Sequence, residues 1–168
     1  MYSVYVLLLK NKRLYVGMTK TWRLHTRFLE HLDPECPTTK WTSKYQTLKK
    51  IHVFSGYTRK QCNTLENLMT ECLMKSYGLD SCRGGKWNMV AEAGKWWVPH
   101  RLHGVPFFTE KWTNLSEHTF AQCVENDPTL SAILSFFQAL QSSRARSFLV
   151  RALDVHPRSI PVCSSSDG

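Results

Sequence analysis

Two short apolar runs near the start of the chain predict a β-hairpin. Residues 4–9 are valine, tyrosine or leucine, and residues 14–16 form a second apolar run that is expected to end at Gly17. The polar residues 10–13 between the two runs suit a short turn. Because successive side chains of a strand point to opposite faces, Tyr5 is expected on the face opposite to that of Val4.

The spacing of apolar residues changes after Gly17 and predicts a helix. Three apolar residues recur every fourth position on one face: Leu24, Phe28 and Leu32. A neighbouring stripe with the same spacing holds three basic residues: Arg23, Arg27 and His31. The two prolines in residues 33–39 break this helix. Two strands followed by a helix should bring the tyrosines of the hairpin close to the basic stripe.

A third strand and a longer second helix are predicted next. Residues 47–54 carry the apolar side chains of a strand, and residues 55–56 are expected to turn the chain. Residues 58–61 begin with threonine and end with glutamine, which is the signature of a capping box. Apolar residues at helical spacing follow in residues 65–73, and Gly78 suits the C-terminal stop near Tyr77.

The second half of the chain predicts an apolar link, further helices and a tail. Residues 96–99 and 105–108 carry apolar anchors, which are expected to fold back onto the preceding domain or to dock a protein partner. Helices are expected at residues 116–124, after Asp127-Pro128 and at residues 148–153. These patterns divide the chain into a domain at residues 1–95, a mainly helical extension at 96–158 and a disordered tail at 159–168.

The positive charge is concentrated in the first part of the chain. The formal net charge is +9; residues 1–60 hold 12 Lys or Arg against 3 acids, and residues 61–168 hold 10 of each. This asymmetry favours a polyanionic partner at residues 1–60. No secretion signal or membrane-span-length apolar stretch is seen, so we expect an intracellular protein without membrane contact, whose six cysteines are reduced thiols.

The hairpin and the first helix together resemble the GIY-YIG endonuclease family. Ser3-Val4-Tyr5 corresponds to the first signature triplet, residues 15–17 (Tyr-Val-Gly) to the second, and Arg27 and His31 keep the Arg-x-x-x-His spacing of the following helix. The chain departs from the family pattern at three points. Ser3 replaces a glycine, valine replaces isoleucine in both triplets, and the interval from Gly17 to Arg27 is about two residues longer than is common.

The resemblance implies a fold, an activity and a set of site residues. The fold would be α/β, with a small three-stranded antiparallel sheet flanked by helices. The activity would be metal-dependent hydrolysis of DNA phosphodiester bonds with Mg²⁺ or Mn²⁺. The implied catalytic residues are Tyr5, Tyr15, Arg27, His31 and Glu66, with Gly17 and Asn88 as possible further site residues.

The resemblance also implies separate roles for these residues. Glu66 would hold the metal, and Glu71 is the competing candidate five residues further along the same helix. Arg27 would bind phosphate through its planar guanidinium. Tyr15 is expected to activate the water or relay its proton to His31, with Tyr5 positioning the water, although the sequence does not separate the two tyrosines.

Further residues are candidates for DNA binding. Basic and aromatic residues alternate in residues 40–45, which suits a surface that follows the phosphate backbone and stacks on bases. The alternative, weighted equally, is that Trp41 packs into the core and the lysines are solvated. The full set of candidates is Arg23, Lys40, Trp41, Lys44, Arg83 and Lys86.

Two other functions compete with the nuclease hypothesis. One is a catalytically inactive nucleic-acid-binding protein on the same scaffold, and the presence of all five expected catalytic residue types argues against it. The other is an interaction module that acts through residues 90–168. The oligomeric state and the structure of the DNA substrate do not follow from the sequence.

Overall fold

A four-stranded mixed sheet forms the centre of the molecule. In the computed structural model, which describes residues 1–36, 40–89, 98–108 and 115–140, the strand order is β3-β1-β2-β4. The strands are β1 (Tyr2–Leu9), β2 (Arg13–Lys20), β3 (Thr47–Tyr57) and β4 (Cys82–Gly84). β1 is antiparallel to both of its neighbours, whereas β4 is parallel to β2. The α/β class is confirmed, and the expected three-stranded antiparallel sheet is wrong because β4 adds a fourth, parallel strand.

The short strand β4 depends on glycine. It covers only Cys82–Gly84 and pairs with β2 from Leu14 to Val16. A Cβ atom at Gly84 would lie 2.3 Å from the carbonyl oxygen of Val16, so any larger residue would push the two strands apart. The paired glycines therefore belong to the end of a strand as well as to the turn that follows it.

The predicted hairpin is present, and its second strand is longer than expected. Residues 10–12 connect the strands, and Asn11 and Lys12 take the positive φ values of 56° and 59° that tight hairpin turns commonly need. β2 continues through Gly17 to Lys20 and stays paired with β1 along its whole length. Gly17 therefore lies within the strand and does not end it. Its missing side chain leaves room for two tyrosine rings, which are described below.

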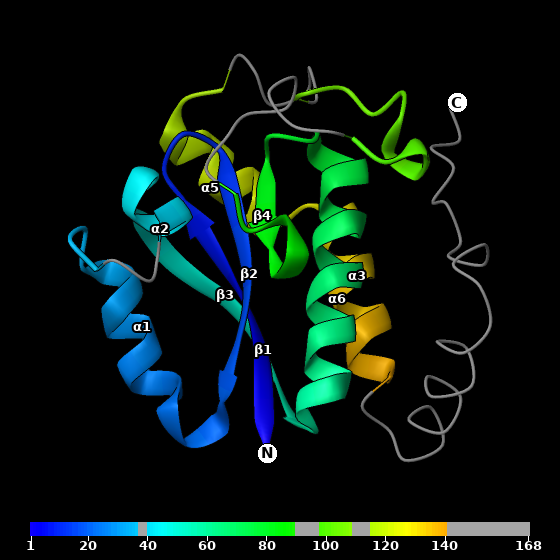
Figure 1. Cartoon of the computed structure of the whole chain (residues 1–168). Helices are drawn as coiled ribbons and strands as arrows, with labels where there is room; N and C mark the ends of the chain where they lie inside the picture. Colours follow the sequence, from blue (N-terminus) through cyan, green and yellow to red (C-terminus); the bar gives the residue numbers. More distant parts are fainter. Residues whose placement is uncertain (37–39, 90–97, 109–114, 141–168) are drawn as a thin grey trace.

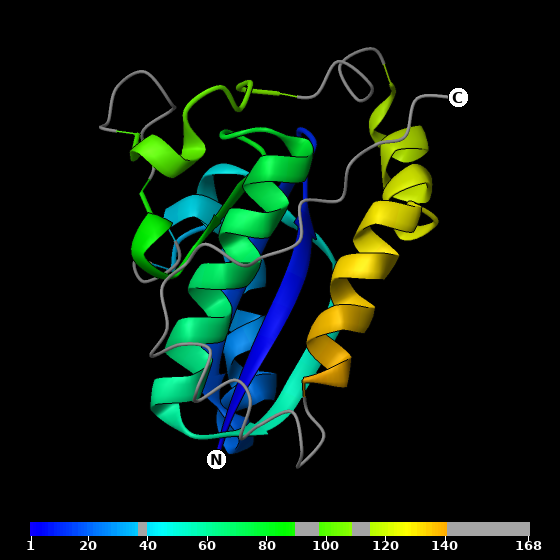
Figure 2. The same cartoon turned by 90° about the vertical axis from the view of Figure 1, so that its right-hand side faces the viewer.

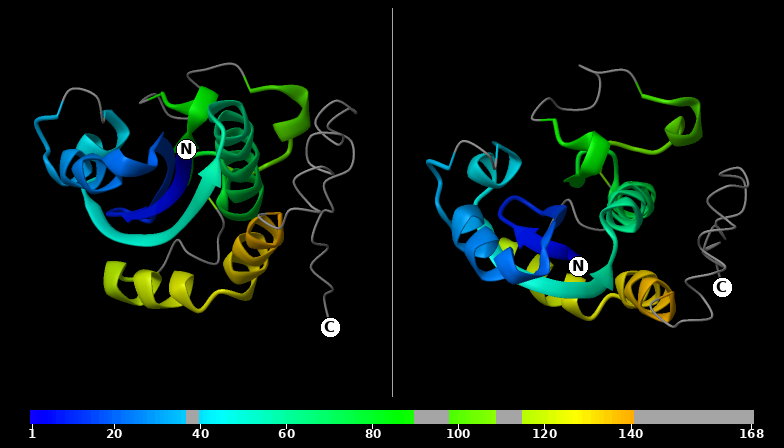
Figure 3. Two further views of the ribbon diagram at one scale, coloured as in Figure 1. Left: turned by 90° about the horizontal axis from the view of Figure 1, so that it is seen from below. Right: turned by 60° about the horizontal axis from the view of Figure 1, so that its bottom comes forward.

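Helices cover the two faces of the sheet with separate apolar cores (Figure 1). α3 (Arg59–Tyr77) packs on one face, where Val4 and Val6 meet Met69. α1 (Leu24–Leu32) and α2 (Lys40–Lys44) lie on the other face, where Tyr5 and Trp41 share a smaller core. Figure 3 shows α1 and α3 on opposite sides of the hairpin, so the sheet separates the two helices that carry the candidate site residues.

Both predicted ends of the second helix are confirmed, whereas the predicted end of the third strand is wrong. α3 has the complete capping box at Thr58 and ends at Gly78, as expected. β3, however, runs on to Tyr57 instead of turning at residues 55–56. Gly56, with φ of 94°, is the extra residue at an irregularity in the pairing between β1 and β3, so it bulges the strand without ending it.

Two helices after residue 115 belong to the main core. The 3₁₀-helix η3 (His100–Leu102) precedes α5 (Glu117–Glu125) and α6 (Pro128–Ala139), and these two helices match the predictions at residues 116–124 and after Asp127-Pro128. Four of their side chains are buried in the cluster that contains Phe54 of β3: Phe120, Val124, Leu130 and Phe137. Figure 2 shows α5 and α6 beside β3 and α3. Residues 1–95 therefore do not contain the whole of this core.

Some expectations fall outside the described residues. These are the tryptophans at positions 96 and 97, the helix at residues 148–153 and the tail at 159–168. Among the described residues, no helix has the length and apolarity needed to cross a membrane. The described cysteines are all free thiols: Cys36, Cys62, Cys72, Cys82 and Cys123.

Candidate active site

Two tyrosines from neighbouring strands lie over one glycine. Tyr5 of β1 faces Gly17 of β2 across the ladder, and Tyr15 lies two residues earlier on the same face of β2. A Cβ atom at Gly17 would lie 2.5 Å from the hydroxyl of Tyr5 and 2.7 Å from the ring of Tyr15. Glycine is required at position 17 because the two aromatic rings occupy the space of a side chain.

A chain of hydrogen bonds joins Tyr5 to the first helix. The Tyr5 hydroxyl lies 2.6 Å from Nε2 of His31, and Nδ1 of His31 lies 2.9 Å from the Thr42 hydroxyl on α2. Nε of Arg27 donates to the Tyr5 oxygen at 3.3 Å. Because the Tyr5 oxygen already accepts from Arg27, we assign its proton to the bond with His31, which places the imidazole proton on Nδ1, donating to Thr42.

α1 presents part of its polar stripe to the sheet, together with the apolar side chains of Leu24 and Phe28. His31 is 1% exposed and Arg27 is half-buried, whereas Leu29 and Leu32 are each 53% exposed. Leu32 shares a face with Leu24 and Phe28 by its spacing, but only Leu24 and Phe28 pack against the core. The hydrogen bonds of His31 to Tyr5 and Thr42 satisfy both ring nitrogens. Burial of the imidazole therefore leaves no polar atom of the ring without a partner.

Burial changes the proton affinities of this group strongly. Burial and the nearby Arg27 charge lower the pKa of His31 to about 3, so its imidazole is neutral at neutral pH. Burial and the charge of Glu66 raise the pKa of Tyr15 to about 12, although Arg27 opposes this with its charge and a hydrogen bond. Burial, together with Tyr15, also raises the pKa of Tyr5. In the free protein both tyrosines are protonated.

Glu66 reaches the same site from α3. It is only 8% exposed and accepts a hydrogen bond from the backbone N–H of Gly85. Burial raises its pKa to about 7 against the lowering effects of Gly85 and Arg27. Its charge in turn acts on both Tyr5 and Tyr15. The charge of Glu66 therefore acts on the two tyrosines, and the charge of Arg27 acts on Glu66, although the sheet lies between the two helices.

The end of β4 explains how groups from both faces meet. β4 pairs with β2 only as far as Val16, so the edge of β2 from Gly17 onward is not covered by that strand. Gly85, whose backbone binds Glu66 of α3, follows directly after β4, and the charge of Arg27 on α1 lowers the pKa of Glu66. The sequence-predicted residues Tyr5, Tyr15, Arg27, His31 and Glu66 are thus brought together.

The competing carboxylate, Glu71, serves a different purpose. Arg101 donates to both of its oxygens at 2.7 and 2.9 Å, and the ammonium of Lys86 lies 3.1 Å from Oε1. Trp87 also donates its ring N–H to Oε1 at 3.1 Å. These groups outweigh the effect of burial and lower the pKa of Glu71 to about 2. Glu71 ties α3 to Lys86, Trp87 and Arg101, whereas the charge of Glu66 acts on the tyrosines.

The candidates for DNA binding separate into buried and accessible residues. Trp41 is 1% exposed and packs against Tyr45, so the prediction that it stacks on bases is wrong. Arg83 is fully buried and pairs with Asp80 at 2.9 Å, so the prediction that it binds DNA is also wrong. The remaining candidates are accessible, and for them DNA binding stays a prediction: Arg23, Lys40, Lys44 and Lys86.

Three groups in the site were not predicted. Thr42 fixes the far side of His31, Glu30 accepts from Arg27 at 2.5 Å, and the backbone of Gly85 binds Glu66. The position of Glu30, three residues after Arg27 in a helix, was a visible signal for this pair. Asn88 is exposed, and its backbone N–H donates to the Gly85 carbonyl, so its role in the site stays a prediction.

A metal ion at this site would depend on very few protein ligands. No group of three or more His, Cys, Asp or Glu side chains suited to a metal occurs in the described part of the chain.

Comparison of the chain with protein-family models, curated proteins and solved structures gave no match. The function is therefore inferred from the site residues and their geometry.

Proposed function

We propose that the protein is a metal-dependent endonuclease that hydrolyses DNA phosphodiester bonds. The observation that carries this proposal is the contact of Tyr5 with both His31 and Arg27, in electrostatic reach of Glu66. These are the residue types that the resemblance to GIY-YIG endonucleases implies, at the positions where it implies them. A purely structural cluster has no need for a desolvated carboxylate beside two buried tyrosines.

Arg27 is the candidate phosphate ligand. Its guanidinium already binds the Tyr5 hydroxyl through Nε and a carboxylate of Glu30 through one terminal nitrogen. Its side chain remains 17% exposed, so an incoming phosphate oxygen can reach it from solvent. A planar guanidinium suits the oxygens of a phosphodiester, and Arg27 would hold the phosphate next to the tyrosine pair.

Tyr5 and His31 form the candidate proton path. We expected His31 to serve Tyr15, but its nitrogen is bonded to Tyr5, so Tyr5 is the better candidate for the residue that passes a proton to His31. In the free protein this transfer is unfavourable, because the pKa of His31 is about 3 and that of Tyr5 is raised. A phosphate bound to Arg27 would offset the positive charge that lowers the pKa of His31, so the path would operate only with substrate bound.

The residues present fit a single divalent cation. Glu66 is a buried carboxylate with a pKa of about 7, and a nearby cation would compensate the cost of its desolvated charge. Mg²⁺ keeps several waters and commonly takes only one or two protein carboxylates. Held by Glu66, Mg²⁺ or Mn²⁺ would stabilise negative charge that develops on the phosphate and the leaving oxygen.

A direct assay tests the proposal with a matched pair of tyrosine variants. The full chain is incubated with plasmid, single-stranded and branched DNA in Mg²⁺, Mn²⁺ or EDTA. We expect cleavage that EDTA abolishes. Tyr5→Phe should lower the cleavage rate at least about a hundredfold, because the proton path is lost. Tyr45→Phe changes another tyrosine of the same small apolar core, outside the hydrogen-bond chain of Tyr5, and should cut normally.

Two results would contradict this account. Binding without cleavage in every metal would favour the alternative, an inactive nucleic-acid-binding protein on this scaffold. Normal cleavage by Tyr5→Phe with a dead Tyr15→Phe would return the proton path to Tyr15.

A further inference from the structure

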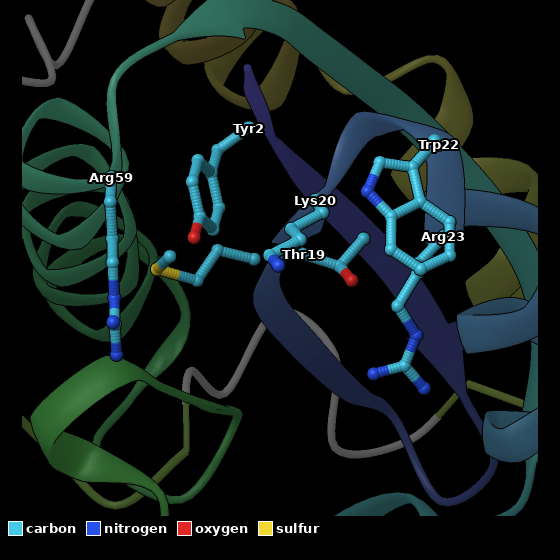
Figure 4. Close-up of a pocket in the computed structure, with 7 residues that line it drawn as sticks. Tyr2, Thr19, Lys20, Trp22, Arg23 and Arg59 are labelled. Carbon is cyan, nitrogen blue, oxygen red and sulfur yellow. The ribbon is translucent and has the colours of Figure 1, made fainter.

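A groove of about 520 Å³ lies beside the candidate active site. Its lining comes from the start of β1, the end of β2, the 3₁₀-turn η1 (Thr21–Arg23) and the start of α3. The side chains labelled in Figure 4 are Tyr2, Thr19, Lys20, Trp22, Arg23 and Arg59. Thr19 lies two residues beyond Gly17 on β2, in the part of that strand that does not pair with β4.

The groove is positively charged. Lys20, Arg23 and Arg59 line it from three separate elements, and none of its lining residues is acidic. Figure 4 shows Arg59 on one side and Arg23 on the other, with Lys20 between them. Such an arrangement suits an extended anion that passes between the two arginines, and it does not suit a single small anion.

One carboxylate connects the groove to the candidate site. Glu30 binds Arg23 through one oxygen at 2.8 Å and Arg27 through the other at 2.5 Å. The Arg23 side chain is 44% exposed, so a phosphate can compete with Glu30 for it. A DNA strand with one phosphate at Arg27 would therefore meet the next positive charges at Arg23 and in the groove.

An aromatic side chain stands in solvent at the rim of this groove. Trp22 is 76% exposed, and the ammonium of Lys20 lies 5.9 Å from the centre of its ring. An indole in water exposes apolar area that a planar ligand would cover, and stacking on an aromatic side chain is how proteins bind single-stranded bases. Cations beside an exposed aromatic ring suit the phosphate and the base of one nucleotide.

We propose that this groove binds an unpaired segment of DNA next to the phosphate that is cut, with a base stacked on Trp22. The inference rests on the proposed nuclease function and names its substrate: DNA in which a duplex adjoins a single strand. A base inside a duplex is already stacked and paired, so it has no free face to offer Trp22. Unpaired nucleotides expose both the base and the backbone that the groove requires.

Binding in EDTA tests this inference without any cleavage. The full-length protein is titrated with an oligothymidylate of eight to ten nucleotides and with a blunt hairpin duplex, and affinity is read by fluorescence anisotropy. Trp22→Leu keeps apolar bulk and removes the aromatic face. Its control is Phe107→Leu, which changes another exposed aromatic residue, 55% exposed and absent from the lining of the groove.

The expected result is a selective loss. Trp22→Leu should bind the single strand about tenfold more weakly, whereas its duplex affinity stays unchanged. Phe107→Leu should bind both as the parent protein does. Equal single-strand affinity of Trp22→Leu and the parent, or an equal loss for both DNAs, would overturn the inference.

A cleavage assay in Mg²⁺ separates failure of the inference from failure of the proposed function. If the parent protein cuts tailed and blunt duplexes equally and Trp22→Leu does the same, the protein is a nuclease and the groove does not select its substrate. If single-strand binding depends on Trp22 but no DNA is cut in any metal, the nuclease proposal fails and the groove remains a binding site.

Discussion

At the scale of single residues, the site depends on polar groups that are buried because each has a partner. His31 lies among Tyr5, Arg27 and Thr42, and both of its ring nitrogens are hydrogen-bonded. A second positive charge beside Arg27 in this buried position would be costly, so the imidazole stays neutral. This has a consequence for stability that is independent of catalysis.

We predict that His31 makes the folded protein less stable as the pH falls. An unfolded chain protonates His31 near pH 6.5, whereas the folded protein resists protonation until about pH 3. The stability that the protein gains by keeping His31 neutral is therefore fully present above pH 6.5, and it is lost progressively between pH 6.5 and 3. Its slope should approach about 1.4 kcal/mol per pH unit in the middle of this window.

Urea unfolding at several pH values measures this effect. The parent protein should lose stability faster than His31→Gln between pH 6.5 and 5, and the comparison cancels the titration of Glu66, which both proteins share. Identical slopes for the two proteins would show that the buried imidazole is not the cause.

The sequence allowed the identity of the site residues to be predicted better than their exposure. The order of Tyr5, Gly17, Arg27 and His31 is a local pattern, so it is visible without the fold. The burial of Arg83 is not local, because it depends on Asp80, three backbone carbonyls and the ring of Trp41. From the sequence alone, a basic residue in a glycine-rich segment that binds phosphate cannot be distinguished from one that is buried and hydrogen-bonded within the fold.

At the scale of elements, α3 is the helix on which fold and site depend together. Its apolar residues pack on the sheet, the charge of Glu66 acts on the two tyrosines, and Glu71 binds Lys86 and Trp87 just after β4. The two carboxylates are five residues apart and differ in their partners, with pKa values of about 7 and 2. We infer that Glu66 serves chemistry and that Glu71 serves stability.

We predict that Glu71→Gln destabilises the protein and leaves the site chemistry intact. The amide keeps the shape of the side chain but loses charge-assisted hydrogen bonds to Arg101 and the ion pair with Lys86. The free energy of unfolding should fall by about 1–2 kcal/mol, since both cations are partly exposed and screened. Thermal unfolding measures the loss, and Glu125→Gln, on an exposed side chain of α5, is the control.

A variant as stable as the parent protein would show that the contacts of Glu71 contribute nothing to the fold.

The elements with strong local signals were predicted correctly, and those set by tertiary pairing were not. The capping box and Gly78 fixed both ends of α3, and Asp127-Pro128 marked the start of α6. β4 was missed because three residues with glycine carry no strand pattern, and its partner, β2, lies more than sixty residues earlier. The extension of β3 past Gly56 depends on its pairing with β1, which the local turn signal does not reveal.

At the scale of the whole molecule, the positive charge and the core are distributed differently. All of the charge excess lies in residues 1–60, whereas the core extends to Phe137 of α6. A protein ending near residue 95 would lose Phe120, Val124 and other side chains that pack with Phe54. The expectation that residues 1–95 form a self-sufficient nuclease domain therefore has to allow for this shared core, and experiments should use the full chain.

We predict that DNA binding weakens steeply with salt and that Lys40 and Lys44 contribute to this dependence. Both lysines are exposed on α2, on the side of the sheet that carries α1. If each contacts a phosphate, replacing both with glutamine should reduce the slope of log affinity against log salt by about 1.8. Filter binding from 50 to 200 mM salt measures the slope. Lys75→Gln, at the C-terminal end of α3, should leave it unchanged.

An affinity that is flat over this salt range would contradict electrostatic binding through the first 60 residues. An unchanged slope in the double variant would move the interface away from α2.

The central claim is that Glu66 holds a catalytic metal beside Tyr5, Tyr15 and Arg27. Glu66→Gln removes the charge with little change of shape, and Glu125→Gln is the matched surface control. Cleavage by Glu66→Gln in Mg²⁺ should fall by orders of magnitude, because charge stabilisation worth several kcal/mol is lost, while DNA affinity in EDTA holds or rises. A folded Glu66→Gln protein that cuts DNA at the parent rate would contradict the account.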